Sequence, residues 1–189
     1  LRLTENQIES LERNHFTHLK NLQIVNLSKN RIRHIDRESF GSNEFLQAIR
    51  LDGNSIKNID YMFENLTQLV FMNISENSLE IFDYENFPKN LQFLDISKNQ
   101  INVIKNPNEI SQNLKTLNLN QNHLTEISAF VLPRNLEDLY LQSNLIEKIS
   151  PYTFLKKPFL KTVDLKNNKI AHLNENALRI SSTKSDEKL

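Results

Sequence analysis

Cysteine is absent from the 189 residues of this chain, and glycine occurs only twice. The first absence excludes a disulfide framework and any metal site built on thiolates. The scarcity of glycine argues against the glycine-rich loops that cradle phosphate groups. Acidic and basic residues number 23 each, so the formal net charge is zero. This balance removes the usual electrostatic argument for nucleic acid or an anionic membrane as a partner.

Long hydrophobic runs are also missing. The most apolar stretch covers residues 127–133, far short of the roughly 20 residues that a membrane-spanning helix needs. No signal peptide opens the chain, which starts at Leu1 in the middle of a repeated pattern. We therefore expect a segment of a longer protein.

The main feature of the sequence is this repeated pattern. The segments LQIVNLSKNRI (22–32) and LKTLNLNQNHL (114–124) place apolar residues at the same positions around one asparagine. The asparagine recurs at steps of 22 to 24 residues, and the apolar frame recurs with it. Its eight positions are Asn6, Asn30, Asn54, Asn77, Asn99, Asn122, Asn144 and Asn168. The period resembles that of leucine-rich repeat arrays over residues 1–179, followed by a polar tail at 180–189.

The alternation inside each copy, as in Val25-Asn26-Leu27, predicts a short strand with one face buried. Each strand would pair in parallel with the strand of the next copy, and the rest of the copy would return on the opposite side. The predicted fold is a leucine-rich repeat solenoid, a horseshoe of the α/β class with eight coils. Its parallel sheet would line the concave face, with mostly loops and short helical turns on the convex face.

The recurring asparagine has a structural explanation. After each strand the chain must turn within the core, and a buried backbone group without a partner costs about 1–3 kcal/mol. The carboxamide of asparagine supplies both a donor and an acceptor on a short side chain. We therefore expect the eight asparagines to form a structural ladder and not a binding site.

The strand register also predicts the side chains on the concave face. One column contains Ile24, Ala48, Phe71 and Phe93, and a neighbouring column contains Arg50, Asp95 and Tyr140. Exposed apolar patches often mark partner sites, so Ile24, Arg50, Phe71, Phe93, Asp95 and Tyr140 are candidate protein-binding residues. Alternatively, the two phenylalanine rings pack only on each other.

Three sequons for N-linked glycosylation begin at Asn26, Asn65 and Asn73. Asn26 and Asn73 are expected on the concave face, where a glycan would shade the apolar column. Together with the repeat length, the sequons favour an extracellular array.

The chain from about residue 60 to residue 180, and its last third in particular, resembles the membrane-proximal ectodomain repeats of arthropod Toll receptors, in the subgroup with long ectodomains. The residues that carry this resemblance are Phe82, Asp83, Tyr84, Pro88, Pro133, Tyr140, Pro151, Tyr152, Thr153, Phe154, Lys157, Pro158, Val163, Asp164, Leu165, Asn176, Ala177, Leu178 and Arg179. The cysteine-rich cap, membrane span and cytoplasmic signalling domain of such receptors have no counterpart in these residues.

The resemblance implies an extracellular segment of a single-pass signalling receptor that acts in innate immunity, development or cell-surface recognition. Its partner would be a protein, either a cystine-knot cytokine or another leucine-rich repeat receptor, and the membrane would be reached only through other parts of the parent chain. The absence of cysteine favours an alternative, a non-receptor adaptor or scaffold, either intracellular or secreted.

Catalytic chemistry finds no support in the sequence. The five histidines do not share a column of the repeat, and no nucleophile and base converge on one predicted pocket. We expect no enzymatic activity, small-molecule substrate, metal or cofactor.

Overall fold

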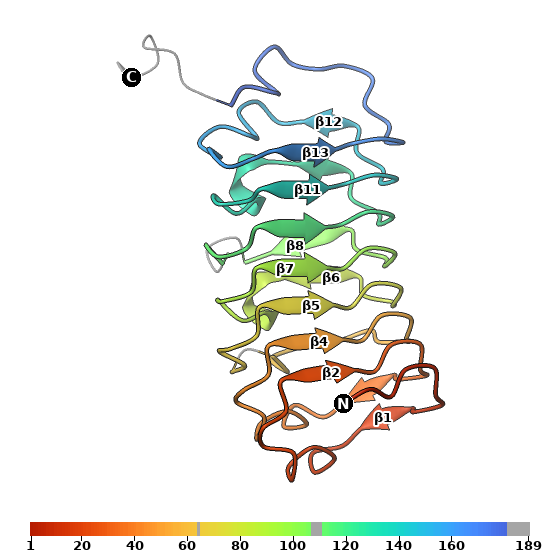
Figure 1. Cartoon of the computed structure of the whole chain (residues 1–189). Coiled ribbons are helices and arrows are strands. Elements are labelled where there is room, and N and C mark those ends of the chain that lie inside the picture. Colours follow the sequence, from red (N-terminus) through yellow and green to blue (C-terminus); the bar gives the residue numbers. More distant parts are fainter. Residues whose placement is uncertain (64, 107–110, 181–189) are drawn as a thin grey trace.

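The computed structural model describes residues 1–63, 65–106 and 111–180, and it confirms the predicted solenoid. The predicted tail lies outside the described residues except for Ile180. Seven strands form the main sheet, with every neighbouring pair parallel (Figure 1). They are β2 (Ile24–Asn26), β4 (Ala48–Arg50), β5 (Phe71–Asn73), β7 (Phe93–Asp95), β9 (Thr116–Asn118), β11 (Asp138–Tyr140) and β13 (Thr162–Asp164). The first coil joins this sheet through an isolated bridge between Arg2 and Asn26 and through a bond from the Leu1 amino group to the Ile24 carbonyl.

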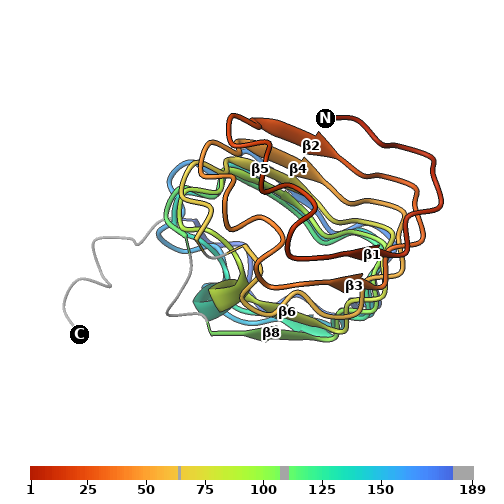
Figure 2. The same ribbon diagram turned by 90° about the horizontal axis from the view of Figure 1, so that it is seen from below.

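The opposite side of the coils contains more strand than the sequence suggested. Three two-stranded parallel sheets run along it, on the far side of the stack from the main sheet (Figure 2). Their pairs are β1 (Ser10–Leu11) with β3 (His34–Ile35), β6 (Ile81–Asp83) with β8 (Val103–Lys105), and β10 (Glu126–Ile127) with β12 (Lys148–Ile149). They form because one apolar residue per coil, such as Leu11 or Ile35, is buried there between neighbours that are exposed or half-buried.

Two 3-10 helices lie at one corner of the stack: η1 (Tyr84–Asn86) and η3 (Ala129–Val131). They belong to coils that are not adjacent in sequence, yet the Tyr84 hydroxyl donates to the Val131 carbonyl at 2.8 Å. The view along the stack shows the two helices at the same corner (Figure 2). Burial of the Tyr84 ring raises the pKa of its phenol well above the usual range, so it stays a donor.

The core runs along the stack between the two sides. The middle residue of each main strand points inward, and Val25, Ile49, Met72 and Leu94 are at most 1% exposed. Val163 in β13 is only half-buried, because no described coil covers it. Three phenylalanines, Phe16, Phe40 and Phe63, continue the core toward the turns, with ring centroids 5.2 Å and 6.0 Å apart along the series.

The carboxamides of the recurring asparagines connect each coil to the one before it. Asn99 is representative: its Nδ2 donates to the carbonyls of Ile96 and Ser97 in its own coil and to Ile74 in the preceding coil. Its Oδ1 accepts the backbone N–H of Leu79 at 2.9 Å. The Oδ1 atoms of the other interior asparagines likewise accept a backbone N–H of the preceding coil; these are Asn30, Asn54, Asn77, Asn122, Asn144 and Asn168. Asn6, in the first coil, is exposed and bonds only within its own turn.

The residue before each of these asparagines has a left-handed backbone, with φ between 53° and 69°. Only one of the eight is glycine, Gly53, and another is Asn167; the others are Glu5, Lys29, Glu76, Lys98, Gln121 and Ser143. Residues with a Cβ avoid this region unless neighbouring contacts enforce it. Two contacts enforce it here. One is the buried carboxamide of the following asparagine, and the other is a hydrogen bond from the backbone N–H of the left-handed residue to a carbonyl of the next coil, as from Lys98 to Asn120.

A second column of side-chain donors joins the coils at the turn before the main sheet. Asn43, Asn90, Asn113 and Asn135 each donate to a backbone carbonyl of the preceding coil. In the following coil this donor is Lys157, 5% exposed, whose Nζ bonds the Leu132 carbonyl at 3.1 Å. Burial lowers the pKa of the Lys157 ammonium below its usual range.

Asn99→Ala is expected to lower the free energy of unfolding by about 3 kcal/mol or more, because several buried backbone groups lose their partner. Asn6→Ala removes only exposed bonds within one turn, so its effect should stay below about 1 kcal/mol. Urea unfolding of both variants measures the difference. Equal losses at the two positions would contradict the role of the ladder.

Lys157 should make stability depend on pH. At pH values between the lowered pKa of Lys157 in the folded chain and its ordinary pKa of 10.5, the unfolded chain binds more protons than the folded one. The stability of the wild-type chain relative to Lys157→Met should therefore rise with pH through this window. Lys156→Met, at the exposed neighbouring lysine, serves as the control and should leave the profile unchanged. A flat or falling difference for Lys157→Met in urea titrations at several pH values would refute the assignment.

Candidate functional site

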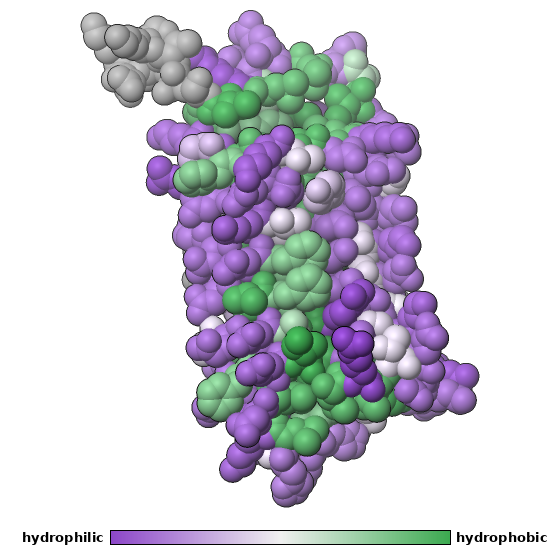
Figure 3. All heavy atoms as spheres, viewed as in Figure 1, coloured by the Kyte–Doolittle hydropathy of each residue, from purple (hydrophilic) through white to green (hydrophobic). Residues whose placement is uncertain are grey.

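The outward side chains of the main sheet form one continuous surface, here called the front face. Hydrophobic side chains gather along its middle, with hydrophilic ones on both flanks (Figure 3). In the register of the sheet, Ile24 pairs with Ala48, Ala48 with Phe71, and Phe71 with Phe93. These four residues form the apolar stripe. Ile24 is 54% exposed, and the other three are half-buried.

Phe71 and Phe93 are the largest side chains of the apolar stripe. Their rings are stacked with centroids 4.6 Å apart and planes within 5° of parallel. Such a pair stabilises the sheet by about 0.5–1.5 kcal/mol beyond the area it buries. The stack also leaves the two rings partly open to solvent as one flat apolar surface, which a partner could cover.

A polar row runs beside the apolar stripe, at the third residue of each main strand. Where this residue is asparagine or aspartate, its Oδ1 accepts the backbone N–H two residues later, which ends the strand. This happens at Asn26, Asn73, Asp95, Asn118 and Asp164. Sequence reasoning missed this role, although an Asn or Asp at a fixed place after each strand could have indicated it.

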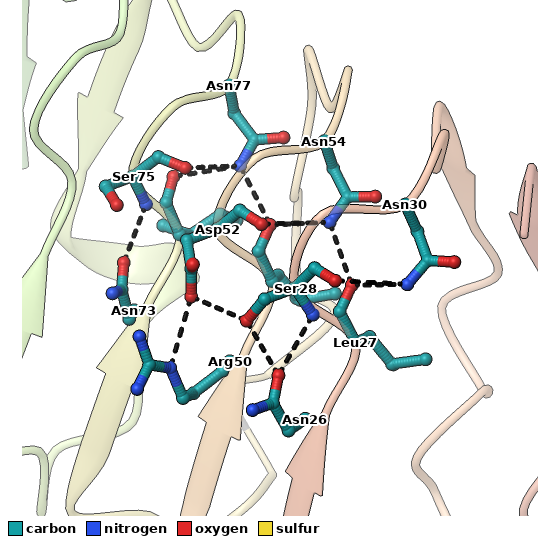
Figure 4. Close-up of polar contacts among 12 residues, drawn as sticks. Asn26, Leu27, Ser28, Asn30, Arg50, Asp52, Asn54, Asn73, Ser75 and Asn77 are labelled. Atoms are coloured by element: carbon teal, nitrogen blue, oxygen red, sulfur yellow. Dashed lines mark hydrogen bonds and ion pairs between the residues drawn. The ribbon is translucent and has the colours of Figure 1, made fainter. Parts of the chain in front are cut away.

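Side chains of the row and the residues after it are connected by hydrogen bonds from β2 to β4 (Figure 4). The Ser28 hydroxyl lies 2.7 Å from Asn26 Oδ1 and 2.8 Å from Asp52 Oδ1, so its single proton is shared between two acceptors. Arg50 Nε donates to Asp52 Oδ1 at 3.2 Å. The contact holds the guanidinium next to the apolar stripe while the Arg50 side chain stays 45% exposed.

The structure brings five of the six candidate binding residues together. Ile24, Arg50, Phe71, Phe93 and Asp95 lie on the adjacent strands β2, β4, β5 and β7. Tyr140 lies on β11, separated from β7 by β9, and so does not belong to the same patch.

Just before the start of β11, Glu137 contacts both Lys161 and Lys115. The hydrogen bond from Lys161 is the main cause that lowers the pKa of the Glu137 carboxyl. Both lysines are exposed and Glu137 is half-buried, so the contacts stabilise little.

The three sequon asparagines occupy two different environments. Asn26 and Asn73 are half-buried on the front face, with their Oδ1 atoms engaged as described and no bond from either Nδ2 to a described residue. Asn65 is exposed and lies in the turn before β5, away from the strands of the main sheet.

The described part of the chain offers neither a candidate metal site nor a helix that could span a membrane. No group of three or more His, Asp or Glu side chains there could hold a metal ion. His15 instead accepts the backbone N–H of Glu12 through Nδ1, a bond local to its turn. The helices of the described residues are three-residue 3-10 turns, so none has the length of a membrane span.

Comparison with known proteins agrees with this architecture. The family model "Leucine rich repeat" matches residues 1–56 and 134–180, and the model "Leucine Rich repeats (2 copies)" matches residues 89–132. Toll-like receptor 7 of Drosophila melanogaster is 38% identical over 122 residues, which is 64% of this chain but only 8% of that receptor. The chain thus spans a small part of this relative.

Solved structures show the same solenoid. The crystal structure of the LRIM1/APL1C complex aligns with a TM-score of 0.82 at 28% identity, covering 97% of this chain and 33% of that one. The structure of the Toll–Spatzle complex aligns with a TM-score of 0.69 at 25% identity, covering 86% and 26%. The fold is that of a protein-interaction scaffold and not of an enzyme. Since the repeat model matches more than half of its residues, the chain belongs to the leucine-rich repeat family, with Toll-like receptors among its relatives.

Proposed function

We propose that the chain is an extracellular protein-recognition segment of a Toll-type transmembrane signalling receptor, and that it binds its partner through the front face. The similarity to Toll-like receptor 7 supports the receptor class. The three sequons support an extracellular location, and membrane attachment and signalling would reside in other parts of the parent chain. Innate immunity, development and cell-surface recognition are the corresponding roles.

The observation that carries this proposal is the stacked pair Phe71 and Phe93 within the apolar stripe, which has hydrophilic side chains on both flanks. Aromatic residues near the centre of an interface, together with arginine, contribute most of the binding energy in protein complexes. Arg50 is held at the border of the apolar stripe by Asp52, and Asp95 borders the stripe on β7. An apolar centre with a charged rim of both signs matches the general anatomy of a protein interface.

The partner is a protein, and two kinds fit the proposal. One is a cystine-knot cytokine, supported by the structural likeness to Toll in its complex with Spatzle. The other is a second leucine-rich repeat receptor. Both would place an apolar segment over the stacked rings and polar groups against Arg50 and Asp95.

Phe71→Ala combined with Phe93→Ala should weaken partner binding at least about 30-fold, the effect of losing a central hot spot. The parent ectodomain would be tested by biolayer interferometry against Spatzle and against a second leucine-rich repeat ectodomain. The matched control is Phe45→Ala with Phe159→Ala, since these rings are 54% and 55% exposed but lie outside the main strands.

Three results are informative. Selective loss in the Phe71 and Phe93 variant supports the proposal. Unchanged affinity for a partner that binds the wild-type ectodomain excludes the apolar stripe as the contact. Equal losses in the variant and its control would indicate a general effect on folding and would also exclude it.

The alternative is a non-receptor adaptor or scaffold that uses the same face, and the absence of cysteine favours it. Labelling of intact cells with a membrane-impermeant biotin reagent separates the two. The receptor proposal requires the parent protein to be labelled, whereas an intracellular adaptor would be protected and a secreted scaffold would appear in the medium.

A further inference from the structure

The exposed sequon at Asn65 lies in a groove outside the main sheet. The groove is lined by residues of two neighbouring coils, among them Arg37, Glu38, Tyr61, Met62 and Asn65 itself. None of its lining residues belongs to a strand of the main sheet. The Asn65 side chain makes no hydrogen bond with another described residue, in contrast to the sequon asparagines on the front face.

Tyr61 gives this groove a fixed aromatic wall. Its φ of 56° is in the left-handed region, which a bulky side chain rarely adopts and which costs on the order of 1 kcal/mol. The conformation is held from the neighbouring coil, where Asn86 Oδ1 accepts the Tyr61 backbone N–H at 3.1 Å. The ring is therefore placed by the stack of coils and not by its own preference.

The Tyr61 ring keeps part of its surface open. The Arg37 guanidinium lies 5.4 Å from the ring centroid, in cation–π geometry, yet the residue remains 44% exposed. An aromatic ring surrounded by charged hydrogen-bonding groups is suited to a sugar, because a pyranose presents an apolar C–H face and polar hydroxyl edges. Arg37 and Glu38 supply such polar groups in the same groove.

We propose that Asn65 carries an N-linked glycan whose first N-acetylglucosamine packs against Tyr61 in this groove. The inference rests on the extracellular location proposed above. In the modification, Asn65 Nδ2 loses a proton and bonds C1 of the sugar, while the C1–O bond to a lipid pyrophosphate carrier breaks; the lipid pyrophosphate leaves intact with the bonding electron pair, which balances the proton released. This glycan then covers the groove between two coils and does not itself cover the apolar stripe.

Four secreted proteins test the packing: the wild-type parent ectodomain, Thr67→Ala, Tyr61→Ala and the double variant. Thr67→Ala removes the sequon but keeps Asn65, and the Thr67 side chain is exposed without a hydrogen bond to a described residue. All four would be trimmed with an endoglycosidase that leaves one N-acetylglucosamine per site. Mass spectrometry would establish occupancy, and urea unfolding would give the equilibrium constant of unfolding.

The expected result is occupancy of Asn65 and coupling between the sugar and the ring. Thr67→Ala should raise the equilibrium constant of unfolding about 3- to 10-fold when Tyr61 is present. In the protein that already carries Tyr61→Ala, the same substitution should leave this constant nearly unchanged. Tyr152 provides a matched control, since it also has a left-handed backbone, with φ of 62°, and is 41% exposed but is part of no sequon. Two further proteins, Tyr152→Ala alone and Tyr152→Ala with Thr67→Ala, should show no coupling between these two positions.

Two results would overturn the inference. One is an unmodified Asn65 in secreted protein. The other is a modified Asn65 whose coupling to Tyr61 is absent or equal to that with Tyr152. Neither result bears on partner binding by Phe71 and Phe93, so failure here is distinguishable from failure of the proposed function.

Discussion

The buried carboxamide of one asparagine per coil is the interaction on which the rest of this structure depends. A coil of 22 to 24 residues cannot satisfy the backbone groups of its own tight turn. Each interior asparagine, such as Asn54, donates to carbonyls of its own turn and of the coil before it, and accepts an N–H from that preceding coil. Because the same three-way contact repeats, it fixes the register of successive coils and makes the strands of the main sheet parallel.

Because the asparagines and the inward residues hold the coils together, a few side chains on the front face are not needed for folding. The inward residues of the strands form the core, and the asparagines and aspartates of the polar row end the strands through their Oδ1 atoms. The first residue of each strand has neither role, so its side chain can vary from coil to coil. The apolar stripe from Ile24 to Phe93 occupies these unconstrained positions, and its hydrophobicity supports the proposed role in recognition.

The same stacking also enforces conformations that the local sequence does not favour. Glutamate and lysine have no intrinsic preference for a left-handed backbone. Glu76 and Lys98 adopt it because hydrogen bonds of the carboxamide ladder and to the neighbouring coil hold the backbone in this conformation. Tyr61 is held in the same way by Asn86, and Lys157 is drawn into a buried position to supply a donor that asparagine supplies in other coils. Contacts between coils thus decide where strain and buried charge occur.

The sequence by itself determined the period, the fold class, the parallel main sheet and the inward residues, because a spacing of 22 to 24 residues and a two-residue alternation directly encode which side chains are buried. It also placed Phe71 and Phe93 in one column. Only the tertiary structure decided that Tyr140 lies apart from this patch and that the Oδ1 atoms of Asn26 and Asn73 end their strands. It likewise revealed the strand pairs on the far side and the groove that joins Tyr61 to Asn65. These features arise from contacts between turns of neighbouring coils, whose relative placement depends on packing and hydrogen bonds over 20 or more residues and not on any local pattern.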